Sequence, residues 1–293
     1  KATRKEYPEG INAYGTDALR FTFASLASTG RDINWDMRRL EGYRNFCNKL
    51  WNAARFVLSN CDGKDVAVDN DNVELSVADQ WIISRLQRAE QNVINALDHY
   101  RLDQAAQAIY EFVWNEYCDW YLELTKPVLN GDSSPAAKAG TRRTLLRVLE
   151  TMLRLMHPIM PYITEEIWQR VKGLVGKSGD SIMLQAYPQP DNSKINVQAK
   201  ANIEWLKGVI AGIRNIRGEM NISPSKALPV LCHNVSADDA LRLERYRSQL
   251  NFLARLDSLT ILANDAELPP AATALVGDMA VLVPLKGFID KDA

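Results

Sequence analysis

The sequence has few of the residue types that hold metal ions or build catalytic motifs. Among its 293 residues are four cysteines and three histidines, and the cysteines lie far apart with no C-x-x-C pair. This spacing excludes the usual zinc sites and is typical of unpaired thiols in a reducing cytosol, so we expect a cytoplasmic protein. Residues 173–178 end like a P-loop but lack its first glycine, and G-x-G-x-x-G, H-E-x-x-H and G-x-S-x-G do not occur. We therefore expect the whole sequence to contain no catalytic residue, no metal site and no cofactor site.

Net charge and long apolar runs are also scarce. The formal net charge of -1 leaves no general basic field, so any nucleic-acid surface must be a local patch. No apolar run approaches the length that spans a bilayer, so we expect no membrane partner. The chain begins at Lys1 with no charged-then-apolar leader and ends at Ala293 without a closing structural signal. These ends are those expected of a piece cut from a longer polypeptide.

Helical periodicity dominates the first 175 residues. Amphipathic segments joined by short polar turns predict an α-helical bundle over residues 1–175, so the fold class is mainly α. Thr16 is the expected N-cap of the first helix, Ser76 with Asp79 forms a capping-box pattern, and Pro127 should end the fourth helix. The expected helices cover residues 16–28, 36–60, 76–99, 103–125, 136–156 and 161–171.

The composition changes near Gly173. Short β-branched runs at 228–232, 259–262 and 280–284 predict strands, and a further apolar run at 182–184 suggests a short one. Helical patterns cover 197–219 and 237–256. The order of these elements, a strand, a helix and two more strands, predicts a small α/β domain, which we place at residues 176–293.

The segment from Asp36 to Asn60 predicts a helix with two different faces. Its apolar side is centred on Cys47, and its far side collects polar residues around Phe56. The apolar side comprises Leu40, Tyr43, Leu50, Ala54, Val57 and Leu58, and the far side comprises Arg38, Asn45, Lys49, Asn52 and Phe56, flanked by Asn48 and Arg55. Amides, cations and one exposed ring are the groups that bind single-stranded RNA. The alternative is a solvated face on which Phe56 packs against a neighbouring helix.

Two further segments are candidates for RNA contact. The fourth helix carries more aromatic surface, from Trp114 to Leu122, than one helix face buries, and packing between helices is the alternative use of these rings. Arg214 and Arg217 lie at a helix end beside a Pro-containing loop. They either bind a phosphate backbone or stabilise the last helical turn, and the sequence leaves both open.

Several motifs together resemble a known family. Residues 15–21 (GTDALRF) and 29–36 (TGRDINWD) are similar to the stretch after the KMSKS loop in class I aminoacyl-tRNA synthetases of the valine, isoleucine and leucine group. Residues 118–123 (CDWYLE) and 157–168 (HPIMPYITEEIW) support the same group. Residues 40–56 (LEGYRNFCNKLWNAARF) resemble the valyl-tRNA synthetases of bacteria in particular. The likeness extends over essentially the whole chain.

This resemblance implies an anticodon-binding bundle followed by a junction that leads to a coiled coil. Catalytic and editing domains would precede Lys1, so ATP with magnesium is expected only for the full-length enzyme, which attaches valine to tRNA. The implied partner is the tRNA for valine, bound by a monomer. The implied anticodon contacts are Arg38, Asn45, Lys49, Asn52 and Phe56, with Leu122 and Glu123 on the fourth helix, and Arg55, Arg214 and Arg217 are candidate contacts to the tRNA backbone. An isoleucyl-type sibling, or a helical protein-interaction scaffold with Phe56 as its hot spot, are the alternatives.

Overall fold

A computed structural model describes residues 4–5, 7–28, 30, 32–33, 35–67 and 73–285 of the chain. Thr29, Arg31 and Asn34 of the family-like stretch, and residues 68–72 of the loop after the second helix, lie outside these ranges. The chain divides into two compact units. The first comprises Lys1–Leu122 and Ser133–Ile195, and the second comprises Glu123–Asp132 and Asn196–Ala293. The division into domains at residues 175 and 176 stays a prediction.

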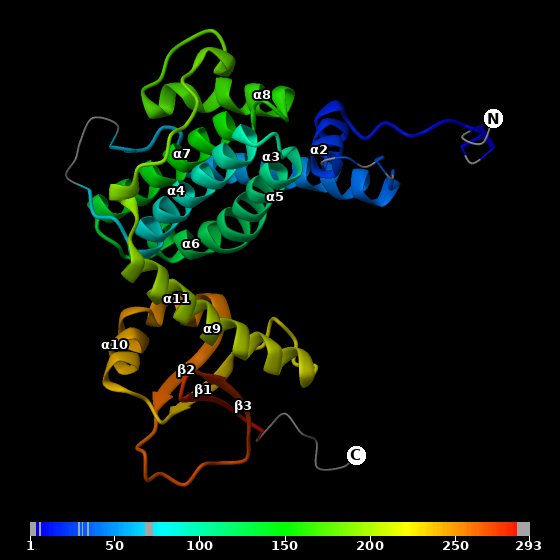
Figure 1. Cartoon of the computed structure of the whole chain (residues 1–293). Helices are drawn as coiled ribbons and strands as arrows, with labels where there is room; N and C mark the ends of the chain where they lie inside the picture. The colour runs from blue at the N-terminus through cyan, green and yellow to red at the C-terminus, as the bar shows by residue number, and fades with distance from the viewer. Residues whose placement is uncertain are drawn as a thin grey trace. The chain divides into compact units, whose positions relative to one another are not determined.

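Helices build the first unit. They are α2 (Thr16–Leu26), α3 (Met37–Cys61), α4 (Val77–Asp98), α5 (Leu102–Tyr110), the π-helical η1 (Glu111–Tyr121), α7 (Pro135–Met156) and α8 (Pro161–Val171). Helix α4 packs against α5 and α7, and α3 packs against α2 and α7, so α3, α4 and α7 lie side by side in Figure 1. The short turns η2 (Lys172–Val175), η3 (Ile182–Leu184) and η4 (Asn192–Lys194) follow. The predicted mainly α fold is confirmed.

The helix starts follow local capping chemistry. Asp36 caps α3 by accepting a hydrogen bond from the backbone N–H of Arg38. Ser76 and Asp79 form the predicted capping box at the start of α4, and Ser134 caps α7. The prediction for Thr16 was wrong. Thr16 is the first residue of α2, Gly15 precedes it with φ of 92°, and no side chain caps this helix.

The fourth predicted helix continues through Pro127 and does not stop there. After η1, α6 (Leu122–Asn130) contains Pro127, and the N–H of Gly131 closes the last turn on the carbonyl of Pro127 at 3.0 Å. Proline removes one helical hydrogen bond, but Val128 and Leu129 beyond it are buried. Their burial offsets the lost bond, so the proline lies inside the last turns of the helix.

A buried carboxylate joins three helices of the first unit. Asp79 is fully buried, and it accepts hydrogen bonds from the Tyr121 hydroxyl at 2.6 Å and the Thr141 hydroxyl at 2.9 Å. Ser76 donates both its N–H and its hydroxyl to the same carboxylate. Burial raises the pKa of Asp79 above its usual value, while these hydrogen bonds lower it in part. Asp79, in the first turn of α4, therefore also ties α4 to η1 and α7.

Helices α2 and α8 are joined through Asp17 and Arg20. The Asp17 carboxylate accepts hydrogen bonds from the backbone N–H groups of Tyr162 and Ile163 in the first turn of α8. Arg20 donates to the carbonyls of Pro158 and Ile159, just before that helix. Asp17 lies in the first turn of α2 and also caps the start of α8.

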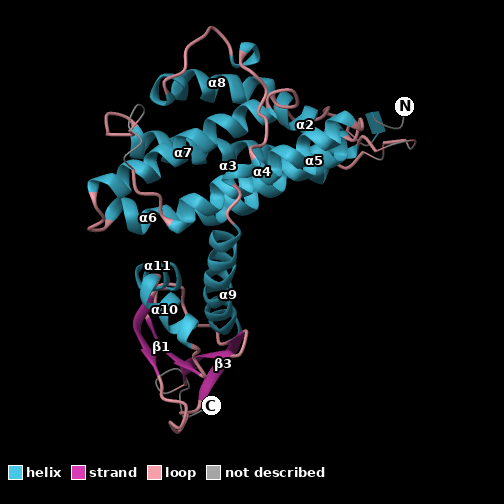
Figure 2. Ribbon diagram, turned by 60° about the vertical axis from the view of Figure 1, so that its left-hand side comes forward, coloured by secondary structure: helices cyan, strands magenta, loops and turns pink. Residues whose placement is uncertain are grey.

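The second unit contains a four-stranded sheet. Its strands are β1 (Leu228–His233), β2 (Leu256–Ile261), β3 (Ala271–Val276) and β4 (Met279–Pro284), in the order β2-β1-β4-β3. Strands β1 and β2 are parallel, and the β1–β4 and β3–β4 pairs are antiparallel. Helix α9 (Val197–Glu219) packs on β3 and β4, beside the magenta strands in Figure 2, while α11 (Arg247–Ala254) packs on β2. The predicted small α/β region is confirmed.

Three details of this region differ from the predictions. Residues 182–184 form the helical turn η3, because Ser181 caps it and the Glu165 carboxylate accepts from the Ile182 N–H. The predicted helix 237–256 is broken at Tyr246 into α10 (Ala237–Arg245) and α11. Strand β3 was missed because its sequence, AATALV, is rich in alanine, which strands disfavour.

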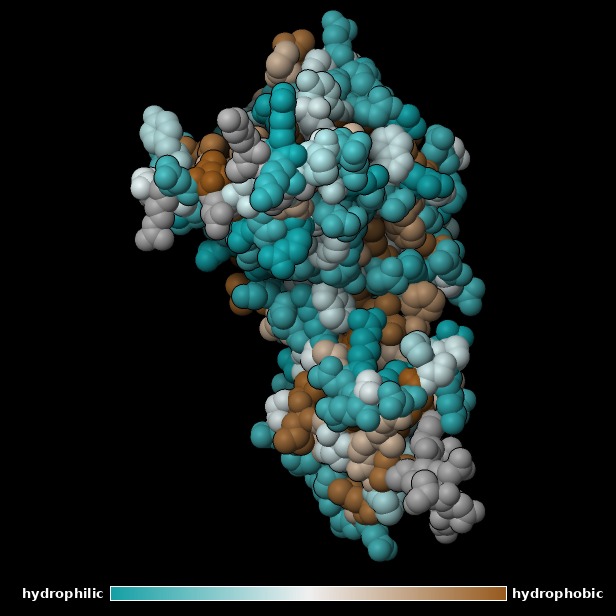
Figure 3. Space-filling model, turned by 90° about the vertical axis from the view of Figure 1, so that its right-hand side faces the viewer, coloured by the Kyte–Doolittle hydropathy of each residue, from teal (hydrophilic) through white to brown (hydrophobic). Residues whose placement is uncertain are grey.

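One face of the surface is drawn in Figure 3. On the face drawn in Figure 3, hydrophilic residues predominate and hydrophobic ones are scattered between them, as on most protein surfaces. In the part of the chain that the structure describes, none of the helices combines the length and apolar character needed to cross a membrane. Within the same residues, His, Cys, Asp and Glu side chains form no group of three or more that could hold a metal ion.

Candidate nucleic-acid interface

Helix α3 positions most of the predicted RNA-binding residues. Arg38, Asn45, Asn52 and Arg55 are exposed along it, and the Arg38 side chain is 90% exposed. The guanidinium of Arg38 pairs with its own helix cap, Asp36, at 3.3 Å. A surface ion pair of this kind contributes little stability, so the guanidinium can exchange Asp36 for another anion at low cost.

The buried side of α3 differs from the predicted one. It consists of Leu40, Phe46, Leu50, Ala53, Ala54, Val57 and Cys61. Cys47, the predicted centre of the apolar side, is only half-buried, and Tyr43 and Leu58 are half-buried as well. The true buried face is thus rotated toward Phe46 and Ala53, since packing against α2 and α7 selects it and these partners are not visible in one helix's periodicity.

Phe56 is half-buried, a position between the exposed ring that stacking requires and the packed ring of the alternative, so its assignment as an anticodon contact stays a prediction. Its backbone carbonyl accepts a hydrogen bond from the Asn60 side chain at 2.8 Å, which closes the last turns of α3. The same rotation of the buried face explains the position of the ring, because Ala53 and Val57 beside it are buried. As a half-buried residue, Phe56 keeps part of its surface accessible.

Lys49 is the predicted residue with the most defined surroundings. Its ammonium forms an ion pair with Asp119 of η1 and lies 4.0 Å from the centroid of the Trp114 ring. Trp114 in turn stacks on Tyr110, with the ring centroids 5.4 Å apart and the planes 15° from parallel. A cation over an indole face is attracted to it, so these contacts hold Lys49 in one position. Asp119, inside the family-like CDWYLE motif, was not among the predicted site residues.

The rings beneath this site form one continuous cluster. Phe46 is fully buried and contacts Phe21, Tyr110 and Trp114, with centroid distances of 5.2, 5.1 and 6.3 Å. Trp114 and Tyr110 are half-buried, so one edge of the cluster reaches the surface beside Lys49. The η1 segment that carries both rings is π-helical, with the N–H of Leu122 bonded to the carbonyl of Tyr117, five residues earlier. Such wider turns occur frequently at functional sites.

The fourth-helix residues of the prediction are less accessible. Leu122 is buried, with 7% of its surface exposed. Glu123 is half-buried and forms an ion pair with Lys126 at 2.6 Å. Neither side chain presents a hydrogen-bonding or stacking surface as open as that of Asn45 or Asn52.

Arg214 and Arg217 of the second unit differ in solvent exposure and in their hydrogen bonds. Arg214 is exposed, and it donates to the Leu253 carbonyl at 3.4 Å. Arg217 is buried, and it donates to the carbonyls of Ser223, Lys226, Ala254 and Arg255 at distances between 2.8 and 3.2 Å. These four bonds join the end of α9 to the loop after it and to the C-terminal end of α11. Arg217 is thus used within the protein, although not on the last turn of its own helix, and its assignment as a tRNA backbone contact stays a prediction.

The cysteine thiols are unsuited to nucleophilic chemistry. Cys47, Cys61, Cys118 and Cys232 are all free. Burial raises the pKa of Cys47 and of Cys118 to about 12, so both remain protonated at neutral pH. The site on α3 offers amides, cations and rings, which bind ligands and do not activate them chemically.

Comparisons with known proteins find one family model, a relative similar over the whole chain, and a solved structure with a partial likeness. The family described as "Anticodon-binding domain of tRNA ligase" matches residues 79–232. The whole chain is 55% identical to the valine–tRNA ligase of Acinetobacter baylyi, and it spans 30% of the length of that protein. Among solved structures, a ternary complex of LeuRS with tRNA and LeuAMS from Agrobacterium radiobacter K84 is similar at 18% identity, with a TM-score of 0.44. That match covers 81% of this chain and 26% of the LeuRS chain.

Proposed function

Because the chain belongs to the family of anticodon-binding domains of tRNA ligases, we propose that the polar face of α3 binds the anticodon of the tRNA for valine. The observation that carries this proposal is the exposed row of Arg38, Asn45 and Asn52 beside the held ammonium of Lys49. The 55% identity to a valine–tRNA ligase supports valine over the isoleucine sibling. Attachment of valine, with ATP and magnesium, is proposed for the complete ligase and not for these residues.

In this proposal each class of side chain has one role. The amides of Asn45 and Asn52 hydrogen-bond the edges of unstacked anticodon bases, which double-stranded RNA would not expose. The accessible part of Phe56 stacks on one base, and Arg38 and Arg55 bind phosphate or a base edge. Lys49 must share or exchange Asp119 to reach the RNA. Leu122 and Glu123 are secondary contacts, and Arg214 is the proposed backbone contact of the second unit. A monomeric state and a cytoplasmic location remain predictions.

Binding of labelled tRNA transcripts, measured by fluorescence anisotropy over a range of salt concentrations, tests this function. We expect tighter binding to the valine transcript than to an isoleucine transcript, and loss of that preference when the two anticodons are exchanged. Contacts with phosphates release counterions, so affinity should fall as salt rises. Equal binding to both transcripts would contradict valine specificity. A salt-independent signal or no binding, in this chain and in the complete ligase, would favour a protein-interaction scaffold.

Substitutions on α3 test the residue assignments. A stacked base is worth about 1–3 kcal/mol, so Phe56→Ala should weaken tRNA binding by about ten- to a hundredfold. Phe252→Ala is the matched control, because Phe252 is an exposed ring on α11 in the second unit. Asn52→Ala should weaken binding by about tenfold, whereas Asn92→Ala, an exposed amide on α4, should not. Circular dichroism checks that each variant is folded.

A further inference from the structure

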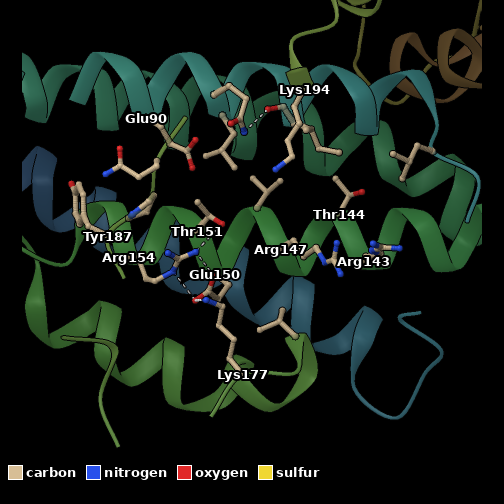
Figure 4. Close-up of a pocket in the computed structure, with 18 of the residues that line it drawn as sticks. Glu90, Arg143, Thr144, Arg147, Glu150, Thr151, Arg154, Lys177, Tyr187 and Lys194 are labelled. Atoms are coloured by element: carbon tan, nitrogen blue, oxygen red, sulfur yellow. Dashed lines mark hydrogen bonds and ion pairs between the residues drawn. The ribbon is translucent and has the colours of Figure 1, made fainter. Parts of the chain in front are cut away.

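A second candidate site lies between α4 and α7, on residues that the proposed anticodon contact does not use. Here a cleft of about 720 Å³ is lined by both helices and by the segment from Val175 to Lys194. We call it the α4–α7 cleft. All of its lining residues belong to the first unit. Figure 4 shows Glu90 and Lys194 on one side of the cleft and Thr144, Arg147 and Thr151 of α7 on the other.

Positive charge is in excess around the α4–α7 cleft. Its lining contains five cationic side chains (Arg143, Arg147, Arg154, Lys177 and Lys194) and two carboxylates, Glu90 and Glu150. Lys194 also forms an ion pair with Asp191 at 3.2 Å, and an anion at Lys194 must share or replace that carboxylate. Glu150 is bonded by both nitrogens of the Arg154 fork, at 2.9 and 3.0 Å, and Lys177 lies 3.6 Å from it. That carboxylate is therefore matched within the protein. A concave surface of one charge sign concentrates ions of the opposite sign, so the cleft favours an anion.

Glu90 adds a second and different requirement. It is 3% exposed, it lines the cleft, and its Oε2 has no hydrogen-bond partner among the residues that the structure describes. A buried acceptor without a partner is costly, and a ligand that donates an N–H or O–H to it would remove that cost. Burial raises the pKa of Glu90 to about 7, although Arg154 and Lys194 lower it and Asp191 raises it. At neutral pH the carboxyl is thus partly protonated, which lessens its repulsion of an anion.

The size and the apolar wall of the cleft limit the ligand further. Ile83, Leu86, Val148 and Val175 contribute apolar surface between the charged ends. Volumes of roughly 300–1,000 Å³ with a few placed polar groups are typical of small-molecule sites. An inorganic anion would leave most of this volume empty, whereas a molecule with a flat or aliphatic body would cover the apolar wall.

We propose that the α4–α7 cleft binds a phosphorylated small molecule of nucleoside monophosphate size, with its phosphate at Arg147 and Lys194 and an N–H donor at Glu90. The phosphate matches the excess of cations better than a single carboxylate does. The body of the ligand lies on the apolar wall formed by α4 and α7. This binding is independent of anticodon recognition, because none of its residues lies on α3.

Calorimetric titration of the chain with AMP, with inorganic phosphate and with adenosine tests this proposal. We expect saturable binding of AMP, with inorganic phosphate and adenosine each at least about tenfold weaker. Arg147→Gln and Lys194→Gln should each weaken AMP and phosphate by about tenfold. Glu90→Leu should weaken AMP by about tenfold without weakening phosphate, because it removes the acceptor together with the carboxyl's partial negative charge. Arg88→Gln, an exposed cation of α4 outside the lining, is the matched control.

Four results would overturn the proposal. They are no saturable AMP binding, equal binding of AMP by all variants, equal binding of AMP and inorganic phosphate, and displacement of AMP by a tRNA transcript, which would assign the cleft to RNA. Measuring tRNA transcript binding by the same variants distinguishes a failure of the cleft proposal from a failure of the anticodon proposal. If Arg147→Gln and Glu90→Leu bind the valine transcript normally, a failure of AMP binding concerns the cleft alone.

Discussion

Replacing Tyr121 with phenylalanine should destabilise the first unit strongly, although the ring itself is kept. The Tyr121 hydroxyl donates to the fully buried Asp79 carboxylate at 2.6 Å, across 42 residues of sequence. Hydrogen bonds to charged groups contribute about 1.5–3 kcal/mol, and Tyr121→Phe leaves this acceptor one donor short. The expected loss of unfolding free energy is therefore about 2 kcal/mol, because three hydrogen bonds from Ser76 and Thr141 remain.

Urea unfolding followed by tryptophan fluorescence measures this loss, since every tryptophan except Trp205 lies in the first unit. Tyr100→Phe is the matched control. The Tyr100 side chain is 87% exposed, so its hydroxyl is solvated in both the folded and unfolded states and its removal should change stability by less than about 0.5 kcal/mol. If Tyr121→Phe and Tyr100→Phe unfold at the same urea concentration, the buried network does not stabilise the bundle.

The difference in unfolding free energy between wild type and Tyr121→Phe should depend on pH, which provides a second check. Burial raises the pKa of Asp79 in the folded state, so the carboxyl takes up a proton there before it does in the unfolded chain as pH falls. The tyrosine hydroxyl stabilises the ionised form most. The stability difference between wild type and Tyr121→Phe should therefore be largest at neutral pH and smaller near pH 4. A difference that grows toward acid pH would refute this account.

Two further predictions concern packing and protonation. A Cβ on Gly140 of α7 would lie 2.2 Å from the backbone oxygen of Glu74, so Gly140→Ala should destabilise the first unit by about 2 kcal/mol in urea. Gly42→Ala, inside α3 with open space around it, should instead stabilise by about 0.5–1 kcal/mol, and the same sign for both would contradict the packing. Burial raises the pKa of Glu90 from 4.5 to about 7, so folding takes up a proton between these values and stability falls as pH rises through them. Glu90→Gln removes this loss, so its unfolding free energy relative to wild type should rise by roughly 1–3 kcal/mol from pH 4.5 to pH 8 in urea, and a constant difference would disprove the assignment.

The contacts of Lys49 affect how the proposed interface should be tested. In the structure its ammonium is already shared between Asp119 and the Trp114 ring. Asp119→Asn would remove a negative charge that an RNA phosphate must otherwise compete with. Such a variant should bind tRNA more tightly if Lys49 contacts RNA, and the gain should disappear when Lys49 is also replaced by methionine.

Local patterns were sufficient for most of the helical elements. The capping box of Ser76 and Asp79 begins α4 where predicted, and the predicted helix 197–219 has the bounds of α9. These features depend on hydrogen bonds and periodicities within a few residues, which a single sequence contains. The polar row of α3 was found for the same reason, since a helical spacing alone separates Asn45 and Asn52 from Leu50.

Local sequence patterns could not predict the features that depend on distant segments of the chain. Strand β3 forms from an alanine-rich run because α9 approaches closely, and a Cβ on Gly212 would lie 2.9 Å from that of Ala274. Helix α6 continues through Pro127 because residues beyond it are buried. In both cases tertiary burial outweighs local propensity, which is a weak preference per residue.

The sequence by itself determined that this protein is mainly helical, that its second helix has a polar face, and that its motifs resemble those of a tRNA ligase. Only the tertiary structure decided which face of that helix is buried, that Phe56 is half-buried, that Arg217 is used internally, and that Asp17 in the first turn of α2 also caps α8. The physical reason is the range of the interactions. Capping and periodicity act within a few turns of one helix, whereas burial and long-range hydrogen bonds depend on partners more than a hundred residues away, as Asp17 and Ile163 are.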